Sequence, residues 1–326
     1  MIITRTPLRI SLGGGGTDLR SYYSRSGGLV VSAAIDKYVF IAINRTFTGD
    51  YFLKYSALER VDDPADIAHP IVREALAAHR IGPGVELVSL ADIPAGTGLG
   101  SSGAFTVGLL RALYAFKREA VTPSAIAEEA CSIEIDRLGR PVGKQDQYIA
   151  AFGGITCFEL QPDGRVQVVP LAVSNDTLHN LEEHLMMFFT GYSRDAERVL
   201  DEQRARSEAR DADMLANLDY VKAIGVQSKE ALESGDVQAF AELMNDHWQH
   251  KKRRSGSMSN PRIDRCYEVA MASGALGGKL VGAGAGGFLL FYAKDNESLR
   301  AAMAAEGLAE VRFHFDHDGS TVLVRG

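Results

Sequence analysis

The chain has 326 residues, of which 46% are hydrophobic and 24% charged, a composition that excludes a disordered protein. Its 35 Lys and Arg against 42 Asp and Glu leave a net charge of −7, which argues against a broad nucleic-acid surface. The length exceeds what one hydrophobic core usually serves, and so predicts one large or two moderate domains.

The first half of the chain mixes short strands with helices. The residue pattern predicts strands over 2–6, 8–12, 29–35, 38–44 and 85–91, and helices over 69–80, 102–117 and 122–137. A Pro-Asp-Gly turn at 162–164 predicts a hairpin of strands 153–160 and 165–170.

The second half has a different residue pattern, with a long helical segment. We predict a strand over 185–190, an almost wholly helical segment over 195–252, a helix over 261–273, strands over 276–281 and 288–293, a helix over 296–306, and strands over 311–316 and 320–324. The irregular alternation favours an α+β fold over a strictly parallel sheet. The change in residue pattern suggests two domains, 1–180 and 181–326.

The cysteines and the apolar segments indicate in which cellular compartment the protein is expected. Cys131, Cys157 and Cys266 form no zinc-binding pattern, and a sparse, odd number of cysteines fits a reducing environment. The N-terminus shows no signal core, and the longest apolar run, 280–293, is too short to span a bilayer. We therefore expect a cytoplasmic protein with no nucleic-acid or membrane partner. A homodimer is left open.

The 33 glycines gather in three clusters, and the cluster at 94–104 carries the clearest chemistry. Backbone N–H groups of a Gly-rich loop can converge on phosphate, and a helix N-terminus behind the loop adds its positive dipole end. The paired serines Ser101 and Ser102 can cap that helix and offer a hydroxyl to Mg²⁺. A plain capped turn is the alternative.

Two other phosphate-binding patterns compete. Gly98–Gly103 and Gly282–Gly287 both satisfy G-x-G-x-x-G, but neither sits in the strand-turn-helix setting of a dinucleotide site. A nicotinamide-dependent oxidoreductase therefore stays a weaker alternative. A Walker A loop fails because Gly143-Lys144 is followed by Gln145.

The clusters at 7–18 and 274–287 flank the central one in the sequence. Four successive glycines at 13–16 suggest close approach of a ligand to the backbone, and Asp18 beyond them can accept hydrogen bonds from hydroxyls. The alternatives are a flexible turn with Asp18 as a helix cap, and close strand packing around 274–287.

Together, in this order, the three clusters resemble the motifs of the GHMP kinase superfamily, which includes galactokinases, homoserine kinases and mevalonate kinases. The resemblance extends from residue 7 to 287 and covers most of the chain. It implies a two-domain α+β fold with a ribosomal protein S5 domain 2-like N-terminal domain and a ferredoxin-like C-terminal domain. It also implies transfer of the γ-phosphoryl group of ATP to a small-molecule hydroxyl.

The resemblance implies roles for individual residues. The central loop would wrap the triphosphate with Pro94, Gly96, Thr97, Gly98, Leu99, Gly100, Ser101, Ser102 and Gly103. Ser102 and Glu134 would bind Mg²⁺, with Asp136 as a competing acid. A solvated helix residue is the alternative for Glu134.

The galactokinase branch carries its catalytic base in Gly-x-x-Asp-Gln, which Gly143–Gln147 matches. Asp146 would then accept or orient the proton of the attacking hydroxyl. Arg9 would hold Asp146 ionised and stabilise the transferring charge, with Lys144 as a second cation. A surface ion pair is the alternative for Arg9.

The acceptor side departs from galactokinases, which carry Gly-Glu-His-Thr-Asp where this chain has Gly14, Gly15, Gly16, Thr17 and Asp18. The resemblance implies that these residues, with Gly284, bind the acceptor. Asp18 would bind ring hydroxyls. Replacement of the Glu by Gly15 makes room and removes repulsion toward an anionic group, so a sugar phosphate is plausible.

The basic run 250–254 agrees, because two of its cations, Lys251 and Arg254, could clamp a substrate phosphate. A solvated helix C-terminus is the alternative. The stretch 258–264, with 35–38, resembles the branch that contains D-glycero-D-manno-heptose 7-phosphate kinases, which phosphorylate the anomeric hydroxyl. An unphosphorylated sugar, as in fucokinase-like members, and a catalytically silent sugar or nucleotide sensor stay open.

Overall fold

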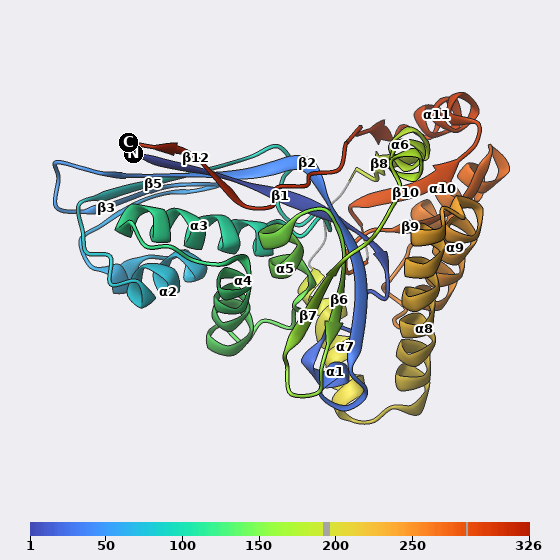
Figure 1. Ribbon diagram of the computed structural model, residues 1–326, viewed down its shortest axis with the longest axis horizontal. Helices are drawn as coiled ribbons and strands as arrows, with labels where there is room; N and C mark the ends of the chain where they lie inside the picture. Colours follow the sequence, from blue (N-terminus) through green and yellow to red (C-terminus); the bar gives the residue numbers. More distant parts are fainter. Residues whose placement is uncertain (192–195, 285) are drawn as a thin grey trace.

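The computed structural model describes residues 1–191, 196–284 and 286–326, and shows two β-sheets with helices packed on them (Figure 1). The strands are β1 (Ile2–Gly13), β2 (Gly28–Arg45), β3 (Tyr51–Lys54), β4 (Leu58–Val61), β5 (Val85–Ala91), β6 (Ile155–Leu160), β7 (Val166–Pro170), β8 (Leu185–Phe189), β9 (Ala275–Leu280), β10 (Phe288–Ala293), β11 (Ala309–Glu310) and β12 (Thr321–Arg325). The α-helices are α1 (Arg20–Ser26), α2 (Pro70–Ala78), α3 (Ser101–Lys117), α4 (Pro123–Cys131), α5 (Gln145–Phe152), α6 (Asn175–His184), α7 (Ala196–Glu208), α8 (Ala212–Ser234), α9 (Val237–Lys252), α10 (Pro261–Ala272) and α11 (Asn296–Ala305). A 3₁₀ turn (Pro64–Asp66) and a π-helical turn (Ser132–Arg137) complete the helical segments described.

The first sheet is built around β2. Its order is β12-β1-β2-β5-β3-β4. Strand β6 pairs with the N-terminal part of β2, and β7 pairs with β6. Residues 39–45 of β2 pair with β5, whereas residues 28–33 pair with β6. Helices α2, α3, α4 and α5 lie along one face of the sheet (Figure 1). The long strand β2 therefore links two parts of the sheet.

The predicted break between strands 29–35 and 38–44 is a bulge within β2. Leu8 pairs with Ile35 while Pro7 pairs with Tyr38, so Asp36 and Lys37 are extra residues opposite one step of β1. A bulge accommodates extra residues by bending the strand without ending it. The predicted pair of strands 2–6 and 8–12 likewise forms one continuous strand, β1.

The second sheet has the order β11-β8-β10-β9. The predicted helical segment after residue 195 is three helices, because Arg210 (φ 59°) and Gly235 (φ 76°) adopt left-handed conformations that end α7 and α8. Asp195, where that prediction begins, lies outside the described residues. Helices α8 and α9 pack against each other beside the sheet (Figure 1).

The strand predicted over 311–316 is wrong for most of its length. Strand β11 covers only Ala309–Glu310, and Phe315 makes an isolated bridge to Ile35. The backbone N–H groups of His314 and Phe315 donate to the side chains of Asp36 and Glu182, so side-chain acceptors replace a strand partner.

The last strand, β12, pairs with β1 in the first sheet, so both chain ends lie together (Figure 1). The division into domains 1–180 and 181–326 stays a prediction. Strand β12, which belongs to the second predicted range, pairs with β1 of the first. Among the described helices, none is long and apolar enough to cross a membrane.

Candidate active site

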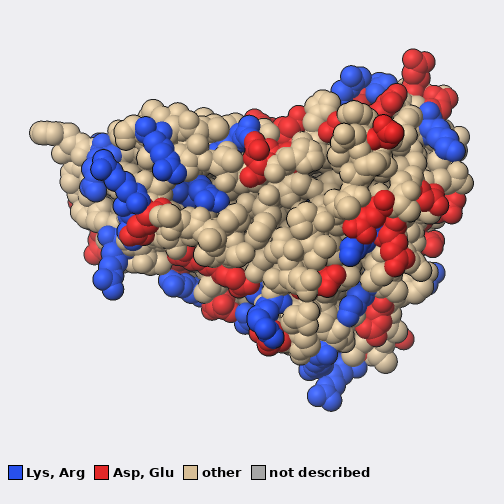
Figure 2. Space-filling view, in the orientation of Figure 1, with Lys and Arg blue, Asp and Glu red and all other residues tan. Residues whose placement is uncertain are grey.

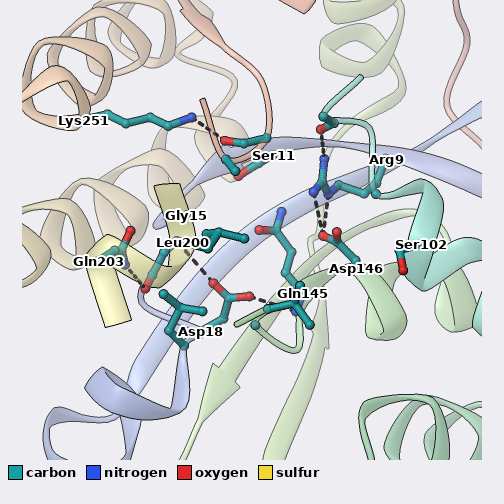
Figure 3. A pocket seen from close by; sticks show the side chains of 18 of the residues that line it. Arg9, Ser11, Gly15, Asp18, Ser102, Gln145, Asp146, Leu200, Gln203 and Lys251 are labelled. Atoms are coloured by element: carbon teal, nitrogen blue, oxygen red, sulfur yellow. Dashed lines mark hydrogen bonds and ion pairs between the residues drawn. The ribbon is translucent and has the colours of Figure 1, made fainter. Parts of the chain in front are cut away.

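Residues from all three glycine clusters border one cavity of about 340 Å³. The predicted site residues that line it are Arg9, Gly15, Gly16, Asp18, Gly96, Gly98, Gly100, Ser101, Ser102, Asp146, Lys251 and Arg254. The predicted site residues that are not part of its lining are Pro94, Thr97, Leu99, Gly103, Gly14, Thr17, Gly284 and Glu134. Figure 3 shows that β1, α5, α7 and α9 all contribute residues around the same space.

Asp146 and Arg9 form an ion pair in the cavity (Figure 3). Nε and Nη2 of Arg9 lie 2.8 and 2.7 Å from Oδ1 of Asp146, while Nη1 of Arg9 donates to the carbonyl of Gly98. Arg9 is buried, and the Asp146 side chain keeps 28% of its surface exposed. The guanidinium thus fixes one carboxylate oxygen, and the carboxylate remains accessible from the cavity.

Helix α5 positions Asp146, and the sequence patterns missed this helix because it is only eight residues long. Gly103 permits the placement, since a Cβ there would come within 2.7 Å of the Asp146 Cβ. The N-termini of α3 and α5 therefore meet at the cavity. The positive ends of their dipoles favour an anion there.

The central loop folds against the third cluster. Gly98 has φ +85°, and a Cβ there would lie 2.6 Å from the carbonyl oxygen of Val281. Gly282 faces it, with a Cβ position 2.5 Å from the Gly98 Cα. Glycine is required at this contact for both space and backbone conformation. Ala285 in the third cluster lies outside the described residues.

Glu134 is completely buried beside Ser102. Its Oε2 accepts from Ser102 Oγ and lies 3.4 Å from Nη1 of Arg140, and its Oε1 accepts from Gln147 Nε2 at 2.9 Å. Burial raises the pKa of the Glu134 carboxyl, while the two hydrogen bonds and the charge of Arg140 oppose the rise. Asp136, the predicted competitor, instead pairs with Arg20.

These groups fit a magnesium ion. A carboxylate and a hydroxyl oxygen lie side by side, and Mg²⁺ commonly takes one or two protein oxygens together with substrate phosphates. Arg140 donates to Ser102 Oγ at 2.8 Å, so a positive charge already occupies the edge of this pair. Among the described residues no group of three or more His, Cys, Asp or Glu could hold a metal ion.

Asp18 sits across Gln145 from Asp146 (Figure 3). Its carboxylate accepts from the N–H groups of Gln145 and Gly16, at 3.0 and 3.2 Å. Burial raises the pKa of the Asp18 carboxyl; the hydrogen bond from Gln145 opposes this and the charge of Asp146 adds to it. Lys144, the predicted second cation, instead binds Glu128 at 2.8 Å and the carbonyl of Gly164.

The two predicted phosphate-binding cations are both buried. Lys251 donates to the carbonyls of Leu280, at 3.0 Å, and Gly282. Arg254 donates through Nη1 to the carbonyl of Gly15 at 2.9 Å and through Nε to Asn217. Gly284 lies against the Met258 side chain.

Sequence reasoning missed several lining residues, among them Ser11, Arg140, Gln203, His247 and Lys279. Lys279 was visible as the one charged residue within the third glycine cluster. His247 lies one helical turn before Lys251, on the same side of α9. Ser11 lies inside the first glycine cluster, whereas Arg140 and Gln203 give no sequence signal, because the fold brings them to the cavity from separate elements.

Known proteins are similar to this chain over almost its whole length. Residues 67–154 match the GHMP kinases N terminal domain, and residues 228–309 match the GHMP kinases C terminal family. D-glycero-alpha-D-manno-heptose 7-phosphate kinase of Campylobacter jejuni is 31% identical, over 98% of this chain and 97% of the relative.

Solved structures agree. A D-glycero-D-manno-heptose 1-phosphate kinase from Bacteroides thetaiotaomicron superposes with a TM-score of 0.82 and 25% identity, covering 99% of each chain. The Lactococcus lactis galactokinase bound to galactose shares the fold, with a TM-score of 0.76 and 19% identity over 100% of this chain and 95% of that one.

The chain therefore belongs to the GHMP kinase family and has its two-domain α+β fold. Kinases of this family use ATP as the phosphoryl donor, so the protein is an ATP-dependent kinase. The family membership replaces the oxidoreductase alternative. The roles of the individual site residues stay predictions.

Proposed function

We propose that this protein is a sugar kinase that transfers the γ-phosphoryl group of ATP to the anomeric C1 hydroxyl of D-glycero-D-manno-heptose 7-phosphate. The product would be the 1,7-bisphosphate, a precursor for GDP-heptose and surface polysaccharide, made in the cytoplasm. The observation that carries the proposal is a carboxylate, Asp146, accessible in a cavity that also contains several buried cations. The 31% identical heptose 7-phosphate kinase supports the choice of acceptor.

Asp146 would accept the proton of the attacking hydroxyl at its carboxylate. Arg9 binds Oδ1, which keeps the carboxylate oriented and leaves Oδ2 for the sugar hydroxyl. The guanidinium also places positive charge where the phosphoryl group would pass. Because phosphoryl transfer depends mainly on positioning and charge neutralisation, this pair needs no further base.

The nucleotide would bind along the central loop. Ser101 and Ser102, the first residues of α3, line the cavity, and a helix N-terminus favours phosphate. Ser102 and Glu134 would hold Mg²⁺, with Gln147 fixing the carboxylate. When bound, the metal would neutralise charge on the phosphate oxygens.

The acceptor would lie between Asp146 and the first glycine cluster. Asp18, fixed by two backbone N–H groups, would accept hydrogen bonds from ring hydroxyls. Gly15 and Gly16 leave space beyond the ring, and Arg254 is bound to the Gly15 carbonyl at that end. A phosphate on the far carbon of the sugar suits this charge.

A coupled assay of ATP turnover tests the proposal with heptose 7-phosphate, unphosphorylated heptose, mannose, galactose and fucose as acceptors. We expect the highest kcat/KM for heptose 7-phosphate. A preference for fucose or galactose would identify an unphosphorylated sugar as the acceptor. Absence of turnover with every acceptor, despite ATP binding, would indicate a silent sensor.

A further inference from the structure

Four basic side chains, those of His247, Lys251, Arg254 and Lys279, line the cavity. Arg254 and Lys279 are only 3% and 2% exposed, and Lys251 and His247 are buried as well. Within residues 1–191, 196–284 and 286–326, none of the four forms a salt bridge with a carboxylate. The charge of Asp18 acts on Arg254, but basic groups outnumber carboxylates in this cluster. Burial of like charges is costly, so the cluster favours an anionic ligand.

Several hydrogen-bonding atoms of this cluster have no protein partner. Nη2 of Arg254, Nε2 of His247 and Oγ of Ser11 are buried and make no hydrogen bond. Nζ of Lys279 contacts only Nδ1 of His247, at 3.2 Å, among the contacts described. These atoms come from β1, α9, β9 and the turn after α9, so the arrangement is built by the fold and not by one segment.

Lys251 differs from Lys279 in this respect. Its ammonium donates to the carbonyls of Leu280 and Gly282, so two of its three hydrogens are bound by the protein. This contact ties α9 to the third glycine cluster. Lys279 and Arg254 therefore have more free donors for a ligand than Lys251 has.

Some of these groups lie beside Gly15, the position at which galactokinases carry a glutamate. A Cβ on Gly15 would lie 3.1 Å from Ser11 Oγ and 3.8 Å from His247 Cε1, and Arg254 binds the Gly15 carbonyl. A side chain at position 15 would grow into the space that these groups border. Glycine keeps that space open beside the cations.

We propose that Lys279, Arg254 and Ser11, with His247 orienting the Lys279 ammonium, bind the phosphate on the far carbon of the acceptor and so select phosphorylated over unphosphorylated sugars. This inference rests on the proposed function, because it assigns one end of that acceptor. Lys279 and Arg254 supply charge, and Ser11 Oγ and His247 Nε2 supply hydrogen bonds to the remaining phosphate oxygens.

The decisive experiment compares Lys279→Met with the wild type on heptose 7-phosphate and on unphosphorylated heptose. We expect the ratio of the two kcat/KM values to fall about 10- to 100-fold, the effect of losing a charged hydrogen bond. Lys252→Met is the matched control: Lys252 belongs to the same basic run but lies outside this cavity and should leave the ratio unchanged.

Three results would overturn the inference. Equal loss on both acceptors would make Lys279 merely structural, and a higher KM for ATP with both acceptors would assign the cluster to the nucleotide. If Lys279→Met does not fold, Ser11→Ala decides: we expect the ratio to fall about two- to tenfold, and an unchanged ratio contradicts the inference. A wild type that ignores heptose 7-phosphate would instead refute the proposed function.

Proton uptake gives a readout independent of turnover. The groups around Lys279 are His247, Lys251, Arg254 and Arg9, with Asp18 and Asp146 beyond them. Burial, and then the charges of Arg9 and Arg254, lower the pKa of Lys279 to about 7. Because a bound phosphate dianion favours the charged form of Lys279, binding above that pKa should be accompanied by proton uptake.

Titration calorimetry of heptose 7-phosphate at pH 8, in buffers of different ionisation enthalpy, measures this uptake. Wild-type protein should take up protons on binding, and Lys279→Met should take up fewer. Equal uptake by the two proteins would contradict the assignment of Lys279 to the phosphate.

Discussion

Buried charges in the cavity are each fixed by a few specific partners. Arg9 holds Asp146, and Ser102 and Gln147 hold Glu134. Because these groups lie in a region of low dielectric, replacing one partner changes the reacting groups more than a surface substitution would.

Asp146→Asn should lower kcat about 100- to 10,000-fold, since it removes the proton acceptor while keeping the hydrogen bond to Arg9. ATP binding, measured by calorimetry, should change little. Asp136→Asn is the control, because that exposed acid pairs with Arg20 away from the cavity. Near-wild-type turnover of Asp146→Asn would exclude Asp146 as the base.

Glu134→Gln should raise the Mg²⁺ concentration for half-maximal activity at least about tenfold, because a neutral amide is a poorer ligand for a hard cation. Burial raises the pKa of Glu134, so in the wild type the apparent Mg²⁺ affinity should fall as the pH drops through that raised value. Titrations with Mg²⁺ at several pH values check both. An unchanged Mg²⁺ requirement would contradict the metal-binding role.

Single-residue predictions from the sequence depended on motifs. Arg9 and Asp146 are 137 positions apart in the chain, and the structure pairs them as the resemblance implies. Lys279 was not predicted, since its burial depends on how β9 packs against α9, which no local pattern specifies.

At the scale of elements, the contact between two glycine loops connects the sheets. Thr97 and Gly98 meet Val281, Gly282 and Gly287 through backbone atoms, at positions where a Cβ would collide. The loop predicted to bind ATP is thus supported by the loop that follows β9. Its geometry depends on glycine on both sides.

Gly98→Ala should destabilise the protein by about 2 to 5 kcal/mol, combining a left-handed backbone with overpacking. It should also raise the KM for ATP. Gly139→Ala is the matched control: it has φ +65° but nothing within 4 Å of its Cβ position, so only about 1 to 2 kcal/mol is expected. Urea unfolding measures both, and equal losses would refute the collision.

Sequence patterns located the long elements well and the short ones poorly. α3 and the hairpin of β6 and β7 closely match the predicted ranges. The short strands β3 and β4 were missed because four residues carry too little periodicity. Residues 311–316 looked like a strand from composition, but they make only scattered backbone hydrogen bonds and one isolated bridge, and the N–H groups of His314 and Phe315 donate to side chains.

For the molecule as a whole, β10 joins two hydrophobic clusters. Leu290 and Tyr292 face the core that extends into the first sheet, while Leu289 and Phe291 face the cluster that contains Trp248. Acidic and basic side chains both occur on the face in Figure 2. Because β10 contributes side chains to both clusters, the two sheets should unfold together.

Urea unfolding followed by two probes tests this coupling. Trp248 is the only tryptophan and reports on the second cluster, whereas far-UV circular dichroism reports on all helices and strands. We expect coincident transitions, because the Trp248 cluster cannot lose β10 without disrupting the larger core. A separate, earlier fluorescence transition would show that the two parts unfold independently.

The central claim is that Asp146 directs the anomeric hydroxyl of a sugar phosphate to ATP, while Lys279 and Arg254 bind the phosphate on its far carbon. Phosphorus NMR of the product formed from heptose 7-phosphate and ATP tests it most directly. The account predicts a 1,7-bisphosphate whose new phosphorus signal couples to the anomeric proton. A new phosphate on any other carbon, or no new phosphate, would contradict it.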